Sequence, residues 1–216
     1  ELAVGWEWLR FGDASINRDG ERIPVSSSDR ENLAKTYDYY GASGVIDKVD
    51  GFLFDKTLLL IGEDGANLIN RSTPIAFLAH GKDWVNNHAH VIDTTYPELM
   101  TYLALFINAI SLEPYVTGTA QPKMNQAKLN SIVIALPPLA EQSRIVTRVD
   151  ELMRLCDALE AKGQLEAAQH AQLVSTLLGT LTASTTPEEL DDQWQRVAQH
   201  FDLLLDRPEA IDALEQ

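Results

Sequence analysis

The stretch IALPPLAEQSRIVTRVDELM, residues 134–153, changes its residue pattern at two consecutive prolines. An apolar run of strand length precedes the prolines, and apolar residues at helical spacing follow them. Pro138 lacks a backbone donor, which costs nothing in the first turn of a helix. Pro137 is pushed toward extended backbone by the proline after it. We therefore predict a domain boundary here, between residues 1–136 and residues 137–216.

Residues 1–136 show the pattern of short strands separated by turns. Asp-Gly pairs and single glycines bound apolar runs of strand length. The predicted strands are Phe52–Phe54, Leu58–Ile61, Pro74–Ala79, Ala89–Ile92 and Ile132–Leu136. Between residues 97 and 111, apolar side chains recur at steps of three and four, which predicts one amphipathic helix. This region is therefore predicted to be a β-rich domain with one helix packed on its strands.

Residues 137–216 are predicted to form long helices. A helix over about 139–183 would be roughly 65 Å long at about 1.5 Å per residue. Its apolar residues step by four and three, as in the seam of a coiled coil. The predicted seam residues are Ile145, Val149, Leu152, Cys156 and Leu159. Such a helix cannot bury its own stripe, so a returning helix at residues 188–205, or a partner, is expected to cover it.

The second helix is predicted to begin with Thr186 as its N-cap and Pro187 in its first turn. Arg207-Pro208-Glu209 is predicted to begin a third helix. The predicted fold class is α+β, a β-rich domain followed by long antiparallel coiled-coil helices.

The charge of the chain limits its possible partners. Its 17 lysines and arginines face 32 acidic residues, a formal net charge of −15, which argues against a broadly basic nucleic-acid coat. From Pro137 onward there are 6 basic and 15 acidic residues, so the helical surface is expected to meet protein rather than phosphate. No apolar run is long enough for a bilayer. The single cysteine, Cys156, excludes an internal disulfide, and we expect a cytoplasmic protein.

The sequence lacks the motifs of three enzyme classes. Leu136-Pro137-Pro138-Leu139 has leucine at both outer positions, where amino-methyltransferases have Asn or Asp and an aromatic residue. A glycine-rich phosphate loop is also missing. Glu160-Ala161-Lys162 matches the E-x-K of a nuclease core but falls in the predicted long helix, not on a strand. We therefore predict no catalytic residue.

Four separated segments resemble the specificity subunit of type I restriction–modification systems. They are GWEWLRFGD (5–13), NNHAHVI (86–92), TGTAQPKMNQAKLNSIVIALPPLAEQSRIV (117–146) and HFDLLLDRPEAIDALEQ (200–216). The resemblance implies a DNA target-recognition domain at 1–136 and a conserved helical spacer and dimerisation region at 137–216. A full subunit of the family carries two recognition domains. The chain is therefore either a fragment or a half-subunit that dimerises, and we expect a fragment.

The resemblance also implies a function and partners. The chain would read one half of a bipartite double-stranded DNA target, with its helices as spacer and docking surface for methyltransferase subunits. Contact with the restriction subunit would be indirect, and self-association through the helices is possible. Methylation and cleavage, with S-adenosylmethionine, ATP and Mg, would reside in those partners, so no cofactor is expected here. The alternative is a coiled-coil adaptor whose β-rich head binds protein or sugar.

His88-x-His90 is the strongest alternative to a purely DNA-reading domain. On one strand both rings would share a face, as a metal pair requires, with Asp93 or His80 as a further ligand. The resemblance instead implies that NNHAHVI holds a strand and its turn by hydrogen bonds, and contact with DNA is the remaining alternative for these two histidines. We therefore predict no metal site.

Three polar loops are the candidates for reading DNA, because Asn and Gln pair with adenine edges and Lys or Arg with guanine. They are residues 39–44 followed by Lys48, residues 63–67 followed by Arg71, and residues 117–125. The candidate contact residues are Ser43, Lys48, Asn67, Arg71, Thr117, Thr119, Gln121, Lys123 and Asn125. The alternative for each is an ordinary turn residue whose side chain caps the backbone.

Overall fold

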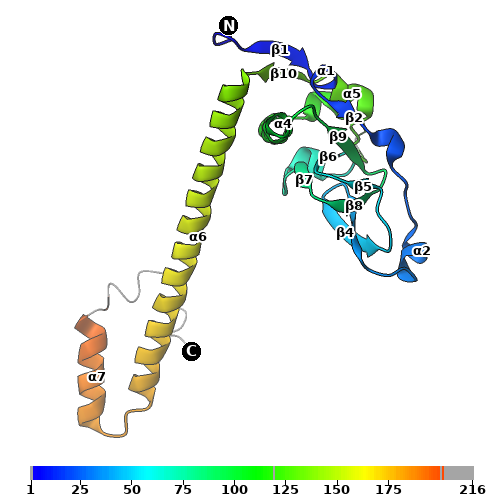
Figure 1. Ribbon diagram of the computed structural model, residues 1–216. Coiled ribbons are helices and arrows are strands. Elements are labelled where there is room, and N and C mark those ends of the chain that lie inside the picture. The colour runs from blue at the N-terminus through cyan, green and yellow to red at the C-terminus, as the bar shows by residue number, and fades with distance from the viewer. Residues whose placement is uncertain (1, 119, 200, 202–216) are drawn as a thin grey trace. The chain divides into compact units, whose positions relative to one another are not determined.

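The computed structural model describes residues 2–118, 120–199 and 201 (Figure 1). The chain divides into two compact units, Glu1–Val149 and Asp150–Gln216. The division falls inside one long helix, because the first turns of that helix pack on the first unit: Ile145 and Val146 contact its core. The predicted domain boundary at 136/137 coincides instead with the change from strand to helix, and it remains a prediction.

The centre of the first unit is a four-stranded antiparallel sheet. Its order is β2 (Ile16–Asn17), β9 (Ala89–Asp93), β6 (Leu58–Gly62), β7 (Ala76–Ala79). All five residues of β6 are buried, because both faces of this strand are covered. Leu59 and Ile61 face one core, and Leu58 and Leu60 face another. A strand that is buried on both faces carries apolar residues at every position. The unbroken apolar run at 58–61 therefore predicts this strand from the sequence.

Helix α4 (Pro97–Ala109) covers one face of this sheet and confirms the predicted packed helix (Figure 1). Its buried residues Leu103 and Ile107 contribute to the larger core. Asn108 fixes the helix to β7: its Oδ1 accepts from the Ala76 amide at 3.0 Å, and its Nδ2 donates to the Ala76 carbonyl at 2.7 Å. These two hydrogen bonds fix the position of α4 relative to β7.

A second sheet packs against the other face through the smaller core. Its order is β4 (Gly44–Val49), β3 (Tyr37–Gly41), β8 (Lys82–Val85), β5 (Phe54–Asp55), with β3 and β8 parallel. Phe54 and Val85 of this sheet meet Leu58, Leu60 and Val91 of the first. The smaller core thus joins the two sheets face to face.

Two sequence-based expectations are corrected in this second sheet. Residues 39–44 were predicted to be a loop, but they are the end of β3 and the start of β4, joined by a turn at 42–43. Tyr39 is 1% exposed and its hydroxyl contacts Val25, so burial places this segment in the sheet. Of the strand predicted at 52–54, only Phe54 is in β5, while Phe52 is 40% exposed beneath the Lys82 ammonium.

The last predicted strand is β10 (Val133–Leu136), which pairs with β1 (Glu7–Arg10). The remaining helices of this unit are short: α1 (Phe11–Ala14), η1 (Asp19–Glu21), α2 (Ser27–Glu31), α3 (Asn67–Asn70), η2 (Glu113–Tyr115) and α5 (Gln126–Asn130).

Helix α6 (Leu139–Thr182) begins directly after the two prolines, as predicted, and has 44 residues. The amides of Glu141 and Gln142 donate to the Pro138 carbonyl at 2.8 and 3.0 Å, so Pro138 starts the first turn. The Gln142 side chain is buried, and its Nε2 donates to the Pro137 carbonyl at 2.9 Å. This contact holds the strand-to-helix junction.

In the second unit, α7 (Pro187–Gln199) folds back beside the C-terminal end of α6 (Figure 1). The Glu189 amide donates to Thr186 Oγ1 at 3.2 Å, and Glu189 Oε2 accepts from the Thr186 amide at 3.3 Å. This reciprocal cap confirms the predicted helix start. The α+β fold class is therefore confirmed, while the third predicted helix lies outside the described residues. Within the described chain, no helix is long and apolar enough to cross a membrane.

The returning helix does not cover the predicted seam, and cover by a partner stays a prediction. Helix α7 packs on Val174 through Val197, with Leu177, Leu178 and Leu181 around the contact, rather than on residues 145–159. Leu152 is 45% exposed and Leu159 61% exposed, and Cys156 is also exposed. The connection at 183–186 is short and α7 has 13 residues, about 20 Å at about 1.5 Å per residue, so α7 lies along only the last turns of α6. Residues 200 and 202–205 of the predicted returning segment lie outside the described chain.

Candidate nucleic-acid interface

The polar loops of the sequence meet where β6 ends. The Gly65 amide donates to the Pro122 carbonyl at 3.0 Å, and the Met124 amide donates to the Glu63 carbonyl at 2.8 Å. The Glu63 amide in turn donates to the His88 carbonyl at 2.8 Å. The segment after β6 is therefore joined to the third loop on one side and to the segment before β9 on the other.

The turn of the β3–β4 hairpin also lies at this place. A Cβ on Gly62 would come within 2.7 Å of the Ala42 carbonyl oxygen and within 2.7 Å of Ile75 Cδ1. Only glycine allows the turn to approach the end of β6 so closely. Residues 42–43, 62–66, 86–88 and 120–124 are called the loop cluster below.

The third loop is held by its own backbone. Thr117 and Lys123 exchange two backbone hydrogen bonds, each 2.8 Å long. Gly118 has φ +84°, and a Cβ there would lie 2.6 Å from the Gln121 carbonyl oxygen. The two ends of the loop are therefore held together at Thr117 and Lys123, and Gln121 is exposed.

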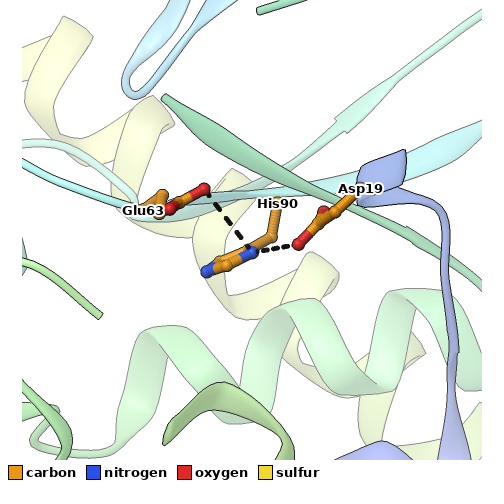
Figure 2. Close-up of side chains that lie close together, drawn as sticks. All are labelled: Asp19, Glu63 and His90. Carbon is orange, nitrogen blue, oxygen red and sulfur yellow. Dashed lines mark hydrogen bonds and ion pairs between the residues drawn. The ribbon is translucent and has the colours of Figure 1, made fainter. Parts of the chain in front are cut away.

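A buried charge network supports this loop from below. His90 on β9 is 1% exposed in its side chain; its Nδ1 lies 2.6 Å from Asp19 Oδ2 and 3.9 Å from Glu63 Oε2 (Figure 2). Its Nε2 lies 2.8 Å from the Met124 carbonyl oxygen. The histidine thus connects η1, the central sheet and the third loop.

Two cations complete the network. Arg22 Nη1 lies 2.7 Å from Glu63 Oε2, and Lys123 Nζ lies 3.1 Å from Glu63 Oε1. Burial acts to raise the pKa of Glu63, but the hydrogen bond from Arg22 and the charge of His90 outweigh it and hold that pKa low. Burial likewise opposes the hydrogen bond from His90 at Asp19, whose pKa also lies below its ordinary value. Both acids are therefore ionised at neutral pH.

The partners of His90 define its protons. A carbonyl oxygen only accepts hydrogen bonds, so Nε2 carries a proton toward Met124. The ionised Asp19 carboxylate also only accepts, so each ring nitrogen of His90 faces a hydrogen-bond acceptor.

Asp19, Glu63 and His90 offer ligand atoms within 4.8 Å of one another, so a metal site has to be considered. A metal-binding imidazole nitrogen must be free of its proton, but both nitrogens of His90 face acceptors. Arg22 and Lys123 already neutralise Glu63. The donor set fits an ion-pair network better than a metal, and we propose no metal here.

The metal site weighed from the sequence also fails on geometry. His88 lies before β9 rather than on it, and its Nδ1 bonds Asp64. Asp93 is held by Arg18 and Lys56, and His80 contacts Thr57. The condition for that alternative, both histidines on one strand, is therefore not met.

Three candidate residues lie exposed in the loop cluster. They are Ser43, Gln121 and Lys123, and the Lys123 side chain is 50% exposed. Within the described part of the chain, the side chains of Ser43 and Gln121 form no hydrogen bond. They are therefore available to an external partner.

Three further candidates hold the loops instead. Asn67 Oδ1 accepts from the Thr73 amide at 3.1 Å, and Asn125 Oδ1 accepts from the Lys128 amide at 3.0 Å. Thr117 Oγ1 donates to the Lys123 carbonyl at 3.2 Å. For these side chains the capping alternative describes the contacts seen.

Lys48 and Arg71 are not brought into the loop cluster. Lys48 pairs with Asp38 at 2.6 Å, away from the hairpin turn. Arg71 Nη2 donates to the Ile110 carbonyl at 2.7 Å and so caps the end of α4. Burial of this guanidinium lowers the pKa of Arg71. Lys48 and Arg71 therefore make contacts within the fold. Thr119 lies outside the described residues.

Sequence reasoning missed the supporting network. Asp19 and Arg22 lie far in sequence from Glu63 and His90, and only the fold brings them together. The available signal was a histidine inside the apolar run predicted as a strand at Ala89–Ile92, since a polar residue in a buried strand needs partners.

The fold thus presents short polar loops at one edge of a β-rich domain that continues into a long helix. The chain belongs to the family described as the type I restriction modification DNA specificity domain, whose family model matches residues 4–169. The resemblance drawn from the residues is thereby confirmed.

Curated relatives carry names of the same class. The chain is 44% identical over 105 residues to the type I restriction enzyme EcoAI specificity subunit of Escherichia coli, covering 48% of this chain and 18% of that protein. It is 32% identical over 241 residues to the EcoEI specificity subunit of the same organism, covering 100% and 39%. The chain thus spans less than two fifths of the length of these relatives.

Solved structures share the fold. A chain from a structural study of complex assembly in the type I R-M system superposes with a TM-score of 0.59 at 20% identity, covering 78% of this chain and 43% of that one. The type I S subunit from M. genitalium gives a TM-score of 0.52 at 13% identity, covering 82% and 47%.

Proposed function

We propose that this chain reads one half of a bipartite DNA target as the non-catalytic part of a type I restriction–modification complex. The observation that carries the proposal is the convergence of three separate polar loops at the end of β6, inside the matched DNA specificity domain. Base readout requires donors and acceptors on exposed loops, held by a rigid scaffold. Gln121, Ser43 and Lys123 are exposed in the cluster, and the network around His90 supplies the rigidity.

The charge of the chain bears on how DNA is held. Most cations of the first unit are paired with acids, including Lys123 with Glu63 and Lys48 with Asp38. Phosphate contacts supply most non-specific affinity, so the chain alone would bind DNA weakly. The proposal therefore assigns much of the phosphate neutralisation to methyltransferase subunits that enclose the duplex. S-adenosylmethionine, ATP and Mg would be used in the partner subunits.

Helix α6 is proposed as spacer and docking surface. Its exposed apolar residues include Leu152, Leu155 and Leu159, which are 45%, 57% and 61% exposed in the isolated chain. An apolar stripe of this length indicates a protein contact. We propose that a methyltransferase subunit or a second helix of the full-length protein covers it, in the cytoplasm. The comparisons do not favour the alternative of an adaptor with a sugar- or protein-binding head.

The proposal is tested with the full-length subunit assembled with its methyltransferase partners. Lys123→Ala is expected to weaken binding on all sequences and to lower the salt slope by about 1. Lys48→Ala is the matched control, because its side chain is 49% exposed and also pairs with one acid. Equal behaviour of the two variants and the wild type in a DNA-binding titration would reject a phosphate contact by Lys123.

A further inference from the structure

His88 occupies a central place in the loop cluster. Its carbonyl accepts from the Glu63 amide at 2.8 Å, and its own amide donates to Asn86 Oδ1 at 2.8 Å. Its ring Nδ1 lies 2.7 Å from Asp64 Oδ2. Backbone and ring are therefore both fixed by groups of the cluster itself.

The ring is fixed but not buried. The His88 side chain is 48% exposed, whereas that of Asp64 is 15% exposed. Within the described residues, Nε2 has no hydrogen-bond partner. The outer nitrogen of a firmly held ring is thus left available at the surface where the loops meet.

The partner of Nδ1 determines what Nε2 can do. An ionised carboxylate only accepts hydrogen bonds, so Nδ1 carries the proton of the neutral ring. Nε2 is then an acceptor. Acceptors of this kind complement the exocyclic amino groups of adenine and cytosine in the major groove. A Gln or Asn amide can rotate to donate or accept, whereas the neutral ring of His88, with its proton directed to Asp64, offers only an acceptor at Nε2.

We propose that His88 is a base-reading side chain that accepts a hydrogen bond from an adenine or cytosine amino group, with Asp64 as its positioning residue. The inference rests on the proposed function, because it requires DNA at the loop cluster. It adds a specific residue and a chemical preference that the three polar loops did not include.

The other histidines of the first unit show why His88 alone has this role. His90 is buried, and both of its nitrogens are bonded. His80 is exposed, and its Nδ1 lies 3.1 Å from Thr57 Oγ1. However, it follows β7 at Ala79, which pairs with Leu58 at the opposite end of β6. His80 is therefore the matched control, an exposed histidine outside the loop cluster.

The test measures sequence preference with the full-length subunit in its methyltransferase complex. Binding is titrated on the cognate DNA and on a set of targets that each change one base pair. His88→Ala is expected to reduce the preference at one adenine or cytosine position by about tenfold and to leave the other positions unchanged. Asp64→Asn is expected to reduce the preference at that same position, because the ring loses its fixed tautomer. His80→Ala is expected to match the wild type.

The outcomes distinguish a failure of the proposed function from a failure of the role proposed for His88. A wild-type complex that does not discriminate between targets would overturn the proposed function and this inference together. A discriminating wild type whose preferences survive both His88→Ala and Asp64→Asn would overturn the inference alone. A uniform loss of affinity on every sequence in His88→Ala would also overturn it, since that indicates a phosphate or structural role.

Discussion

His90 Nε2 lies 2.8 Å from the carbonyl oxygen of Met124, and through this contact the central sheet holds the third loop. The other nitrogen of the same ring lies 2.6 Å from Asp19. One buried imidazole thus ties the loop cluster to two distant parts of the chain.

Removing this ring should destabilise the first unit strongly. His90→Ala removes the ring from Asp19 Oδ2 and from the Met124 carbonyl, and removing one partner of a buried polar pair of this kind costs about 3–5 kcal/mol. The measurement is the free energy of unfolding in urea, with His80→Ala as control, which should change it by less than about 0.5 kcal/mol. Equal stability of the two variants would show that the network does not hold the fold.

Gly62 should tolerate no side chain. A Cβ there meets the Ala42 carbonyl oxygen at 2.7 Å, and backbone cannot move away as a flexible side chain can. Gly62→Ala is expected to cost about 1–3 kcal/mol of unfolding free energy and to displace the hairpin turn. Gly20→Ala is the control, because nothing lies within 4 Å of its Cβ position. Unchanged amide chemical shifts at residues 42–43 in Gly62→Ala would contradict the close approach.

Asp83 should make stability depend on pH. Its side chain is buried, and neither carboxylate oxygen has a hydrogen-bond partner within the described chain. Burial and the charge of Asp38 raise the pKa of Asp83 to about 7. The ordinary pKa in an unfolded chain is about 3.9, so the folded state holds the proton more tightly. Its stabilising contribution is present below about pH 4 and is lost as the pH rises through about 7.

Asp83→Asn keeps the shape and removes this ionisation. The wild type is expected to lose about 2–3 kcal/mol of stability between pH 5 and pH 8 that the variant keeps. Urea unfolding at both pH values measures the difference. Asp55→Asn on the neighbouring strand is the control, since its side chain is 59% exposed. A wild type and an Asp83→Asn variant with parallel pH profiles would rule out a buried acid titrating in this range.

The two halves of the α6 stripe should respond differently in the isolated monomer. Val197 is 5% exposed against Val174, so Val197→Ala should weaken the docking of α7 by roughly 2 kcal/mol. Leu152 is 45% exposed, and Leu152→Ala should change stability by less than about 0.5 kcal/mol. Hydrogen exchange of the α7 amides and urea unfolding measure the two effects. A comparable loss in both variants would mean that the seam is already covered within the monomer.

The sequence predicted those elements whose residue pattern has a single physical cause. β6 is apolar without a break because it is buried on both faces, and α6 begins where Pro138 permits only a first turn. Helix α4 carried a clear period of three and four. By contrast, β3 was read as a loop because its polar and aromatic residues suit either state, and only the burial of Tyr39 decides it.

The sequence predicted which segments form the candidate site, but it did not predict the contacts between their residues. The three loops do meet, but the hydrogen bonds that join residues 63–65 to 122–124 depend on the sheet register. Arg71 and Asn67 look like DNA-contacting residues in sequence, yet their side chains satisfy nearby backbone groups. Such local use of a polar side chain is decided by turn geometry, which composition does not reveal.

The most direct test of the account is site-specific photo-crosslinking to DNA. A photoreactive amino acid is placed at position 43, 121 or 80 of the full-length subunit, and the assembled methyltransferase complex is irradiated on its cognate target. Positions 43 and 121 lie in the loop cluster and are expected to crosslink to bases of one half-site, whereas position 80 at the opposite end of β6 is expected to remain uncrosslinked. Crosslinks from position 80, with none from 43 and 121, would contradict the claim that the loop cluster reads the DNA.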